Sequence, residues 1–371
     1  MNNLIYLPLD WLKIYDPSLC SNDYAHNHWF KMYDVNLWPS HLTSRVHKLK
    51  TPWDLAPTVC PIPDIIPNFE LRFDIVMDGI TAKFCDYIKS SGKTPYLSWS
   101  GGIDSTSILV SLLKVGDADF LKKLVVVCNE KSIVENAFFY YHFINNKITT
   151  LSIDDESFKI TAENYDKIVI LDGESGNQIM GSPHINHLVK SGRRDILKQP
   201  WRSLNYKDII QGVTEFQMEL IQESIDCSPI PIDSVADLSW WVAFNFKMDD
   251  VLLRKMALYV GNLTPDQSGD FWNTGIFRHY AQPEMQRWSM ATKDIRHTQS
   301  ILKYTPKKYI YDFDQNDLWF ASKTEQGSNS HRHVDNLFGN STIIALDKDW
   351  NKYYISDSDT RQKLGQILEK I

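Results

Sequence analysis

The stretch from residue 95 to residue 107, PYLSWSGGIDSTS, constrains the fold of this chain more than any other feature. Tyr96–Trp99 has the residues of a short strand, two adjacent glycines follow, and residues 108–113 are almost all apolar, as in a buried helix. A strand, a glycine turn and a helix in this order are typical of an α/β fold. In such folds the ligand binds at the turn after the strand.

The glycine turn has the chemistry of a phosphate-binding loop. Gly101 and Gly102 let backbone N–H groups point inward, and the helix that follows adds the positive end of its dipole. Asp104 would repel a bare polyphosphate, so its place in the loop indicates a divalent cation that bridges carboxylate and phosphates. The loop therefore predicts binding of Mg-ATP or Mg-pyrophosphate. Four neighbouring side chains add hydroxyl donors: Ser98, Ser100, Ser105 and Thr106.

The loop lacks the Gly-Lys-Ser/Thr ending of the Walker motif and the Gly-x-Gly-x-x-Gly spacing of dinucleotide-binding proteins. It resembles the pyrophosphate loop (PP-loop) of the N-type ATP pyrophosphatases, which cleave ATP between the α- and β-phosphates and leave a substrate adenylated. The alternative is a turn rich in Ser and Gly that precedes a helix without binding phosphate. The strand and the helix on either side favour the phosphate loop.

The composition limits the class of protein. With 371 residues, 43% of them hydrophobic, the chain is long enough for one large core or two moderate ones. A net charge of -7 gives no reason to expect nucleic acid as a partner. The five cysteines never fall as Cys-x-x-Cys, and no apolar run is long enough to span a membrane. We therefore expect a soluble cytoplasmic protein.

The middle of the chain alternates between strand and helix patterns. This alternation predicts a doubly wound parallel sheet in an α/β fold, with ligands at the carboxyl ends of the strands. A second loop, Asp172–Gln178, directly follows one of the strands, so both loops should face one cleft. The aromatic residues of 133–145 are expected in the core. The patterns predict helices over 69–91 and 133–145 and strands over 124–128, 148–153 and 167–171.

The two ends differ from the middle. Residues 1–68 are rich in proline and aromatic residues, which predicts a small irregular N-terminal region; its histidines match no metal-ligand spacing. Residues 69–330 should form the ATP pyrophosphatase domain, whose C-terminal half is helical with helices near 234–260 and 278–300. Residues 331–371 should form a C-terminal extension with a hairpin around 347–351 and a final short helix.

The sequence of the second loop resembles that of a known enzyme family. Residues 172–181, DGESGNQIMG, follow the run SGEG(S/A)DELFG of the synthetase half of glutamine-dependent asparagine synthetase and of β-lactam synthetase. Phe246–Arg254 resembles the lysine-methionine-aspartate helix of that family, and Lys308–Phe313 with Ser322–Gln326 resembles its Lys-x-Ile-Leu-Arg and Lys-Glu-Gln segments. With the first loop, these blocks cover roughly residues 70–330 in the family order. The resemblance implies the PP-loop fold, which is similar to the adenine nucleotide alpha-hydrolases.

The resemblance also implies a reaction. These enzymes are ATP-dependent ligases that adenylate a carboxylate, release pyrophosphate and transfer the acyl group to ammonia or an amine. By position, Glu174 would be the catalytic base and Lys323 the group that stabilises transition-state charge. Asp104 and Asn177 would hold Mg. The residues implied to bind ATP and pyrophosphate are Ser98, Trp99, Ser100, Gly101, Gly102, Asp104, Ser105, Thr106, Asp172 and Gly173.

Several positions depart from the family. Asn177 and Gln178 replace a metal-binding aspartate and the glutamate after it, which should weaken metal binding, and Tyr311 replaces an arginine. Residue 2 is Asn rather than the cysteine nucleophile of the glutaminase half, so nitrogen should come from ammonia, an amine or a separate glutaminase subunit. Two alternatives stay open: another PP-loop enzyme that modifies tRNA or a nucleobase, and a non-catalytic ATP-binding module.

Overall fold

The computed structural model divides the chain into two compact units, which are described separately. The first unit comprises Met1–Ile62, Ser182–Arg254 and Ser328–Ile371, and the second comprises Pro63–Gly181 and Lys255–Gly327. The expected ends of the middle domain, at residues 69 and 330, lie close to two of these boundaries, but residues 182–254 group with the two ends of the chain. The structure describes residues 5–8, 45–46, 60–153, 160–180, 183–210, 215–248, 251–252, 263, 265–293, 303–323, 342–346 and 352–356.

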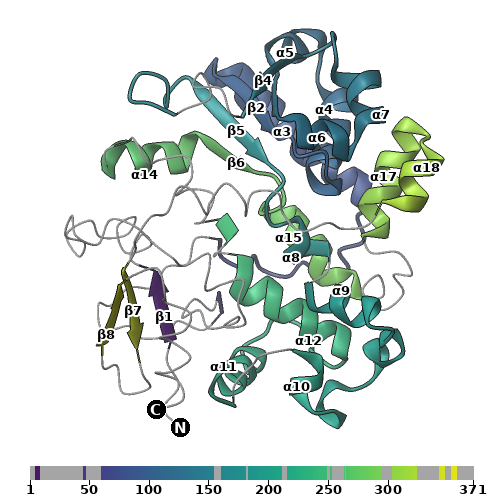
Figure 1. Ribbon diagram of the computed structural model, residues 1–371, viewed down its shortest axis with the longest axis vertical. Helices are drawn as coiled ribbons and strands as arrows, with labels where there is room; N and C mark the ends of the chain where they lie inside the picture. The colour runs from purple at the N-terminus through teal and green to yellow at the C-terminus, as the bar shows by residue number, and fades with distance from the viewer. Residues whose placement is uncertain are drawn as a thin grey trace. The chain divides into compact units, whose positions relative to one another are not determined.

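The second unit is built on a five-stranded sheet in which every neighbouring pair is parallel (Figure 1). The strands are β2 (Thr94–Ser98), β3 (Val125–Cys128), β4 (Thr149–Ser152), β5 (Ile168–Asp172) and β6 (Ile276–Arg278), and the order across the sheet is β4-β3-β2-β5-β6. The first strand in the sequence, β2, lies in the middle of the sheet. The next two, β3 and β4, add on one side of it, and β5 and β6 add on the other side. This order confirms the expected α/β class and places the topological switch between β2 and β5.

The strand and helix lengths follow from the apolar pattern. Every residue of β3 and of β5 is buried, as expected for strands covered on both faces. Helix α3 (Phe73–Ser91) buries one apolar face and ends at Gly92, whose φ of 71° closes the last turn. Helix α4 (Ile103–Val115) follows the first loop, and α5 (Ala118–Lys123) is capped by Asp117.

The helix expected over 133–145 is interrupted. Asn136 leaves the helical conformation, with φ -146° and ψ 65°, and its side chain caps the next turn at Phe139. The segment therefore splits into α6 (Glu130–Glu135), α7 (Ala137–Phe139) and a π-helical turn, Tyr140–Ile144. Phe139 lies in the core as expected, but Phe138 and Tyr141 are exposed, so that expectation was wrong for these two rings.

The later part of the second unit contains a strand that the sequence pattern did not predict. β6 has three residues, too few for a visible alternation, and it pairs with β5 from Ile170 to Asp172. The helix expected from residue 278 begins instead at Pro283, because proline suits the first turn, Arg278 ends the strand and residues 279–282 form the turn between them. The helices here are α8 (Gly176–Met180), α14 (Pro265–Thr274), α15 (Pro283–Ala291), α17 (Tyr304–Asp314) and α18 (Asp317–Ser322).

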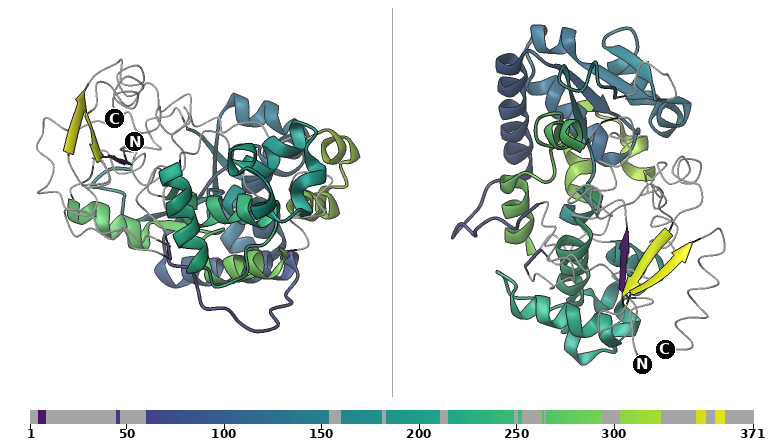
Figure 2. Two further views of the ribbon diagram at one scale, coloured as in Figure 1. Left: turned by 90° about the horizontal axis from the view of Figure 1, so that it is seen from below. Right: turned by 90° about the vertical axis from the view of Figure 1, so that its left-hand side faces the viewer.

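The first unit contains a small antiparallel sheet of β1 (Ile5–Pro8), β7 (Thr342–Leu346) and β8 (Lys352–Ser356), seen in the right-hand view of Figure 2. Leu346 pairs with Lys352, which confirms the hairpin around 347–351, and β1 adds to its edge. The expected final helix lies outside the described residues. The helices of this unit are α9 (Pro183–Lys190), α10 (Tyr206–Ile209), α11 (Glu215–Asp226) and α12 (Val235–Val242).

Helix α12 forms the core of the first unit. Ser234 and Asp237 form a reciprocal capping box at its start, and the helix continues through a π-helical turn, Ala243–Lys247. Trp240 stacks on Phe244 with 4.5 Å between the ring centroids. This bears out the helix expected from residue 234 over the residues described there. No helix in the described part of the chain is long and apolar enough to cross a membrane.

Candidate functional site

The first loop, residues 99–102, joins β2 to α4 and is fixed by its own hydrogen bonds. Gly101 has φ 73°, and the carbonyl of Ser132 stands where its Cβ would lie, so this position requires glycine. The N–H of Ser100 donates to Ser105 Oγ at 3.1 Å, and the N–H of Gly102 donates to Ser100 Oγ at 3.3 Å. Two hydroxyls expected to meet phosphate thus also hold the shape of the loop.

Two of the residues expected to bind the nucleotide lie in the interior. Trp99 is 1% exposed, and its indole N–H donates to Thr106 Oγ1 at 3.1 Å. Ser98 is half-buried at the end of β2, where it pairs with Val127. Trp99 and Thr106 therefore support the loop by packing and hydrogen bonding, while the exposed Ser100 and the half-buried Gly102 are the members of the loop open to solvent.

The second loop, Asp172–Gln178, comprises the last residue of β5, a turn over residues 173–175 and the first residues of α8. Asp172 is the last residue of β5; it is buried, and its Oδ1 accepts the N–H of Glu174 at 3.2 Å. Ser175 has φ 69°, a left-handed conformation that is rare for a residue with a side chain, and its buried hydroxyl has no hydrogen-bond partner among the described residues. The side chain of Glu174, the expected base, is half-buried at this turn.

The two loops touch. A Cβ built on Gly173 would lie 2.9 Å from the backbone nitrogen of Ser105, and a Cβ on Gly176 would overlap the Asp104 carboxylate. The contact follows from the topology, because β2 and β5 are paired neighbours and both loops leave their carboxyl ends. The structure thus brings together Asp104, Ser105, Gly173 and the start of α8, as the sequence predicted for the two loops.

Lys303, which belongs to none of the sequence motifs, forms an ion pair with Asp104 where the two loops meet. Lys303 Nζ lies 2.5 Å from Asp104 Oδ2, and the two side chains are 7% and 18% exposed. Lys303 immediately precedes α17 and has φ 54°. The carbonyl of Asp104 accepts the hydroxyls of Ser107 at 2.9 Å and of Tyr280 at 3.3 Å. Both the backbone and the carboxylate of Asp104 are therefore held in place.

Lys323, the expected charge-stabilising residue, also lies at the first loop. Its ammonium pairs with Glu135 of α6, and the two side chains are 7% and 13% exposed. Glu135 packs directly against Gly101. The carbonyl of Lys323 accepts Nζ of Lys307 at 2.8 Å, and burial lowers the pKa of Lys307. Glu135 and Lys307 were not predicted from the sequence, since their contacts with Lys323 form only when the chain folds.

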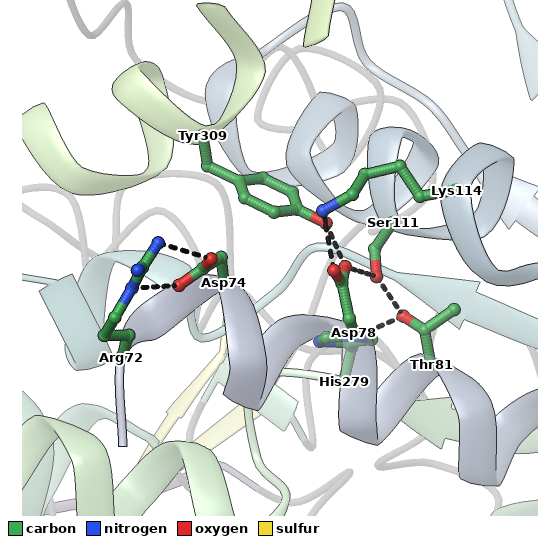
Figure 3. A network of polar contacts seen from close by, with 8 residues as sticks. All are labelled: Arg72, Asp74, Asp78, Thr81, Ser111, Lys114, His279 and Tyr309. Carbon is green, nitrogen blue, oxygen red and sulfur yellow. Dashed lines mark hydrogen bonds and ion pairs between the residues drawn. The ribbon is translucent and has the colours of Figure 1, made fainter. Parts of the chain in front are cut away.

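A partly buried polar network holds α17, which follows Lys303 and carries Lys307, against α3 and α4 (Figure 3). Asp78 Oδ1 accepts the hydroxyls of Ser111, at 2.9 Å, and of Tyr309, while Lys114 Nζ lies 2.6 Å from Asp78 Oδ2. Burial raises the pKa of Tyr309, so the phenol stays protonated and donates to the carboxylate. The network fixes the helix from which Lys303 reaches Asp104.

The network continues to the end of β6. Ser111 Oγ lies 2.7 Å from Thr81 Oγ1, and Thr81 Oγ1 lies 3.0 Å from Nε2 of His279 (Figure 3). Burial lowers the pKa of His279 to about 3, so the imidazole is neutral at physiological pH. This histidine packs inside the unit and is not a candidate for acid–base chemistry.

The oxygen ligands suit a magnesium ion only in part. Asn177 Oδ1 is buried and has no hydrogen-bond partner in the described part of the chain, so it is available as a ligand. Asp104 could supply a carboxylate, although one of its oxygens holds Lys303. Across the described residues, no three His, Cys, Asp or Glu side chains gather as a metal site. The set fits a cation that brings phosphate ligands with it.

The other residues of the resemblance are partly described. Tyr311, which stands where the family has arginine, donates its hydroxyl to Asp317 at 2.8 Å and so ties α17 to α18. Ser322 and Lys323 end α18, and residues 324–326 lie outside the described part. No protein-family model and no curated protein matches this chain.

Proposed function

We propose that the chain is an ATP-dependent amide-forming synthetase similar to asparagine synthetase. It adenylates a carboxylate, releases pyrophosphate, and transfers the acyl group to ammonia or an amine, with AMP as the second leaving group. The observation that carries the proposal is the contact of Asp104 with Gly176 and Lys303 at the carboxyl ends of β2 and β5, together with Lys323, whose partner Glu135 packs on Gly101 of the first loop. A site that handles a polyphosphate needs this combination of an open helix start and fixed cations.

The first loop would bind the phosphates. The backbone N–H groups around Gly102 and the first turn of α4 form the anion-binding end of a helix thirteen residues long. Asp104 and Asn177 would hold Mg²⁺, which neutralises charge on the leaving pyrophosphate when it is bound. Lys323 lies beside the same loop and would meet negative charge as it develops on phosphoryl and carbonyl oxygens.

The second loop would serve the amide-forming half of the reaction. The carboxylate substrate attacks the α-phosphorus, and pyrophosphate leaves with the electrons of the broken P–O bond. The amine nitrogen then attacks the acyl carbon, the C–O bond to AMP breaks, and Glu174 accepts the proton that the nitrogen loses. Its backbone N–H is held by Asp172, which keeps the carboxylate at the turn next to Gly173.

Release of pyrophosphate and AMP from ATP tests the proposal. A panel of carboxylates and amines should contain a pair that produces both, and formation of ADP and phosphate instead would reject the adenylation chemistry. Lys323→Ala should lower the rate about a hundredfold, the usual effect of losing a group aimed at transition-state charge. Lys122→Ala is the matched control, because Lys122 is an exposed lysine on α5 paired with Asp119.

The nitrogen source is part of the proposal. Ammonium or an amine should support product formation, whereas glutamine should support it only when a separate glutaminase is added. We also propose a cytoplasmic location, because the described cysteines Cys60, Cys85, Cys128 and Cys227 are free thiols. A tRNA substrate is disfavoured by the net charge of -7.

A non-catalytic ATP-binding module is the second candidate. It is favoured by the neutral side chain of Asn177 and by the two ion pairs, which already neutralise Asp104 and Glu135. Such a module would bind ATP equally with and without Mg²⁺ and would release no pyrophosphate with any substrate pair. A synthetase would need Mg²⁺ for turnover, so one titration separates the two candidates.

A further inference from the structure

A lysine side chain, Lys303, supplies a positive charge at the contact between the two loops. The ammonium of Lys303 lies 2.5 Å from Asp104 Oδ2, and only 7% of the lysine side chain is exposed. Lys303 is the residue before α17, and Tyr309 on that helix is bonded to Asp78 of α3 (Figure 3). The ammonium group is therefore fixed at the carboxylate and is not a surface charge that happens to rest there.

The residues around this pair attract a free metal ion only weakly. Asn177 offers a buried oxygen without formal charge, and Gly176 before it lies against the Asp104 carboxylate. Mg²⁺ gives up its water reluctantly and binds well where carboxylates and phosphates combine. A carboxylate already paired with an ammonium, beside a neutral amide, does not provide such a combination.

We propose that Lys303 is the resident cation of the free loops, and that a divalent cation enters only together with a polyphosphate. Phosphate oxygens attract the ammonium more strongly than the carboxylate does, because a polyphosphate carries several negative charges. Lys303 then turns to the phosphates, and Asp104 Oδ2 becomes available to the entering cation. The exchange leaves Asp104 neutralised in both states, as a buried charge requires.

Equilibrium dialysis of Mn²⁺ against the full chain tests this directly, because it compares the metal retained with and without protein, both for Mn²⁺ alone and for Mn²⁺ with pyrophosphate. The unaltered protein should bind no Mn²⁺ below about 1 mM, and pyrophosphate should tighten its binding about tenfold or more. Tight binding without pyrophosphate would overturn the proposal. So would a pyrophosphate complex that binds Mn²⁺ no better than the free protein does.

Removal of the lysine charge should create the metal site that Lys303 excludes. Lys303→Met should bind Mn²⁺ without pyrophosphate about tenfold more tightly than the parent, because Asp104 loses its ammonium. The double variant Asp104→Asn with Lys303→Met should lose this gain. If Lys303→Met gains no affinity, or the double variant keeps the gain, the proposal is wrong.

Lys114→Met is the matched control. Lys114 lies on α4, the helix that contains Asp104, about 15 Å further along its axis, and it pairs with Asp78 of α3. Asp78 keeps the hydrogen bonds from Ser111 and Tyr309 after this change, so Mn²⁺ affinity should stay within about twofold of the parent. A Mn²⁺ site as tight as that of Lys303→Met would show that any unpaired carboxylate binds the metal and would overturn the role of Lys303.

Melting temperatures keep the test decisive if Lys303→Met is unstable. The single variant should melt lower than the parent, and Mn²⁺ should restore part of the loss; the double variant should melt closer to the parent and not respond to Mn²⁺. An ion pair with a purely structural role would show the loss without any response to metal. These outcomes concern the free protein, whereas the proposed synthetase function is judged by pyrophosphate and AMP release, so either can fail alone.

Discussion

The two loops at the switch point are built in opposite ways. The first loop is held internally, with Ser100 and Ser105 bonded to one another and Gly101 in the left-handed conformation that a tight turn needs. The second loop places a serine, Ser175, in that conformation and leaves its buried hydroxyl without a partner among the described residues. The first loop is thus rigid, whereas the second loop lies in close contact with α4. Gly173 and Gly176 have no Cβ, so the backbone of Ser105 and the Asp104 carboxylate can lie against them.

This difference separates two requirements of a phosphate site. A cradle of N–H groups must keep its shape before the ligand arrives, and internal hydrogen bonds provide that. A neighbouring loop must approach within van der Waals contact, and glycine provides that by removing the Cβ. The left-handed serine costs about 1 kcal/mol, so the second loop is strained where the first is not.

The largest expected effect comes from Gly101→Ala. The alanine would meet the Ser132 carbonyl and would adopt a left-handed φ, and together these should lower the free energy of unfolding by about 4 kcal/mol. Urea unfolding measures the loss. Gly79→Ala is the control, since Gly79 lies in α3 with open space at its Cβ and should gain about 0.5 kcal/mol. A loss below 1 kcal/mol for Gly101→Ala would mean that the first loop is adaptable.

Glu135→Gln should have the next largest effect. It leaves the buried ammonium of Lys323 without its counter-charge, which should lower the free energy of unfolding by about 3 kcal/mol and slow pyrophosphate release. Glu135→Asp keeps the charge and should recover part of both quantities. Equal stability and rates for the Gln variant and the parent would exclude Glu135 as a positioning residue for Lys323.

Gly176→Ala tests the close contact between the second loop and the Asp104 carboxylate. The added methyl would displace the Asp104 carboxylate, so pyrophosphate release should fall about a hundredfold, while stability should fall by about 1–2 kcal/mol because this turn can shift. Steady-state rates and urea unfolding together give the two numbers. If stability falls more than for Gly101→Ala, the comparison between the loops must be reversed.

Asn177→Asp should sharpen the role of the second loop in metal binding. The added carboxylate should lower the Mg²⁺ concentration for half-maximal pyrophosphate release about tenfold, because its charge acts in a partly enclosed site. Asn205→Asp is a suitable control, since Asn205 caps α10 in the other unit. An unchanged Mg²⁺ requirement would remove residue 177 from the ligand set.

Ser175→Gly should have the smallest effect and the opposite sign. Glycine adopts φ 69° without strain, so the free energy of unfolding should rise by about 0.5 kcal/mol after the entropy of the extra glycine is taken into account. Chemical denaturation measures the change. A lower stability would indicate that the Ser175 hydroxyl contributes to the fold despite its lack of a hydrogen bond in the described structure.

Local sequence signals were sufficient for four of the five strands of the parallel sheet and for both loops. Buried strands such as Val125–Cys128 are continuous apolar runs, and glycines mark the turns after them, so neither needs information from distant residues. Strand β6 could not be predicted this way, because three residues are too few to show an alternation of apolar and polar side chains. They form a strand because they pair with β5. The break at Asn136 depends on a side chain that caps its own helix turn, a choice the helical pattern does not reveal.

The charge pairs of the site could not be predicted for a different reason. Lys303 and Asp104 are 199 positions apart, and nothing in the residues around Lys303 marks it as a partner of a loop. Its place follows from the network around Asp78 that fixes α17, which exists only once three helices have packed. Lys323 was predicted because it stands in a recognisable block, whereas its partner Glu135 stands in none.

The distance in sequence between Asp104 and Lys303 also determines when their ion pair can form during protein synthesis. A ribosome adds about ten residues each second, so the 199 residues between the loop aspartate and its lysine take about twenty seconds to make. During that interval β3, β5 and β6 are added to β2, but the ammonium of Lys303 is not yet present. The ion pair can therefore form only after most of this unit, including β2, β3, β5 and β6, has been synthesised.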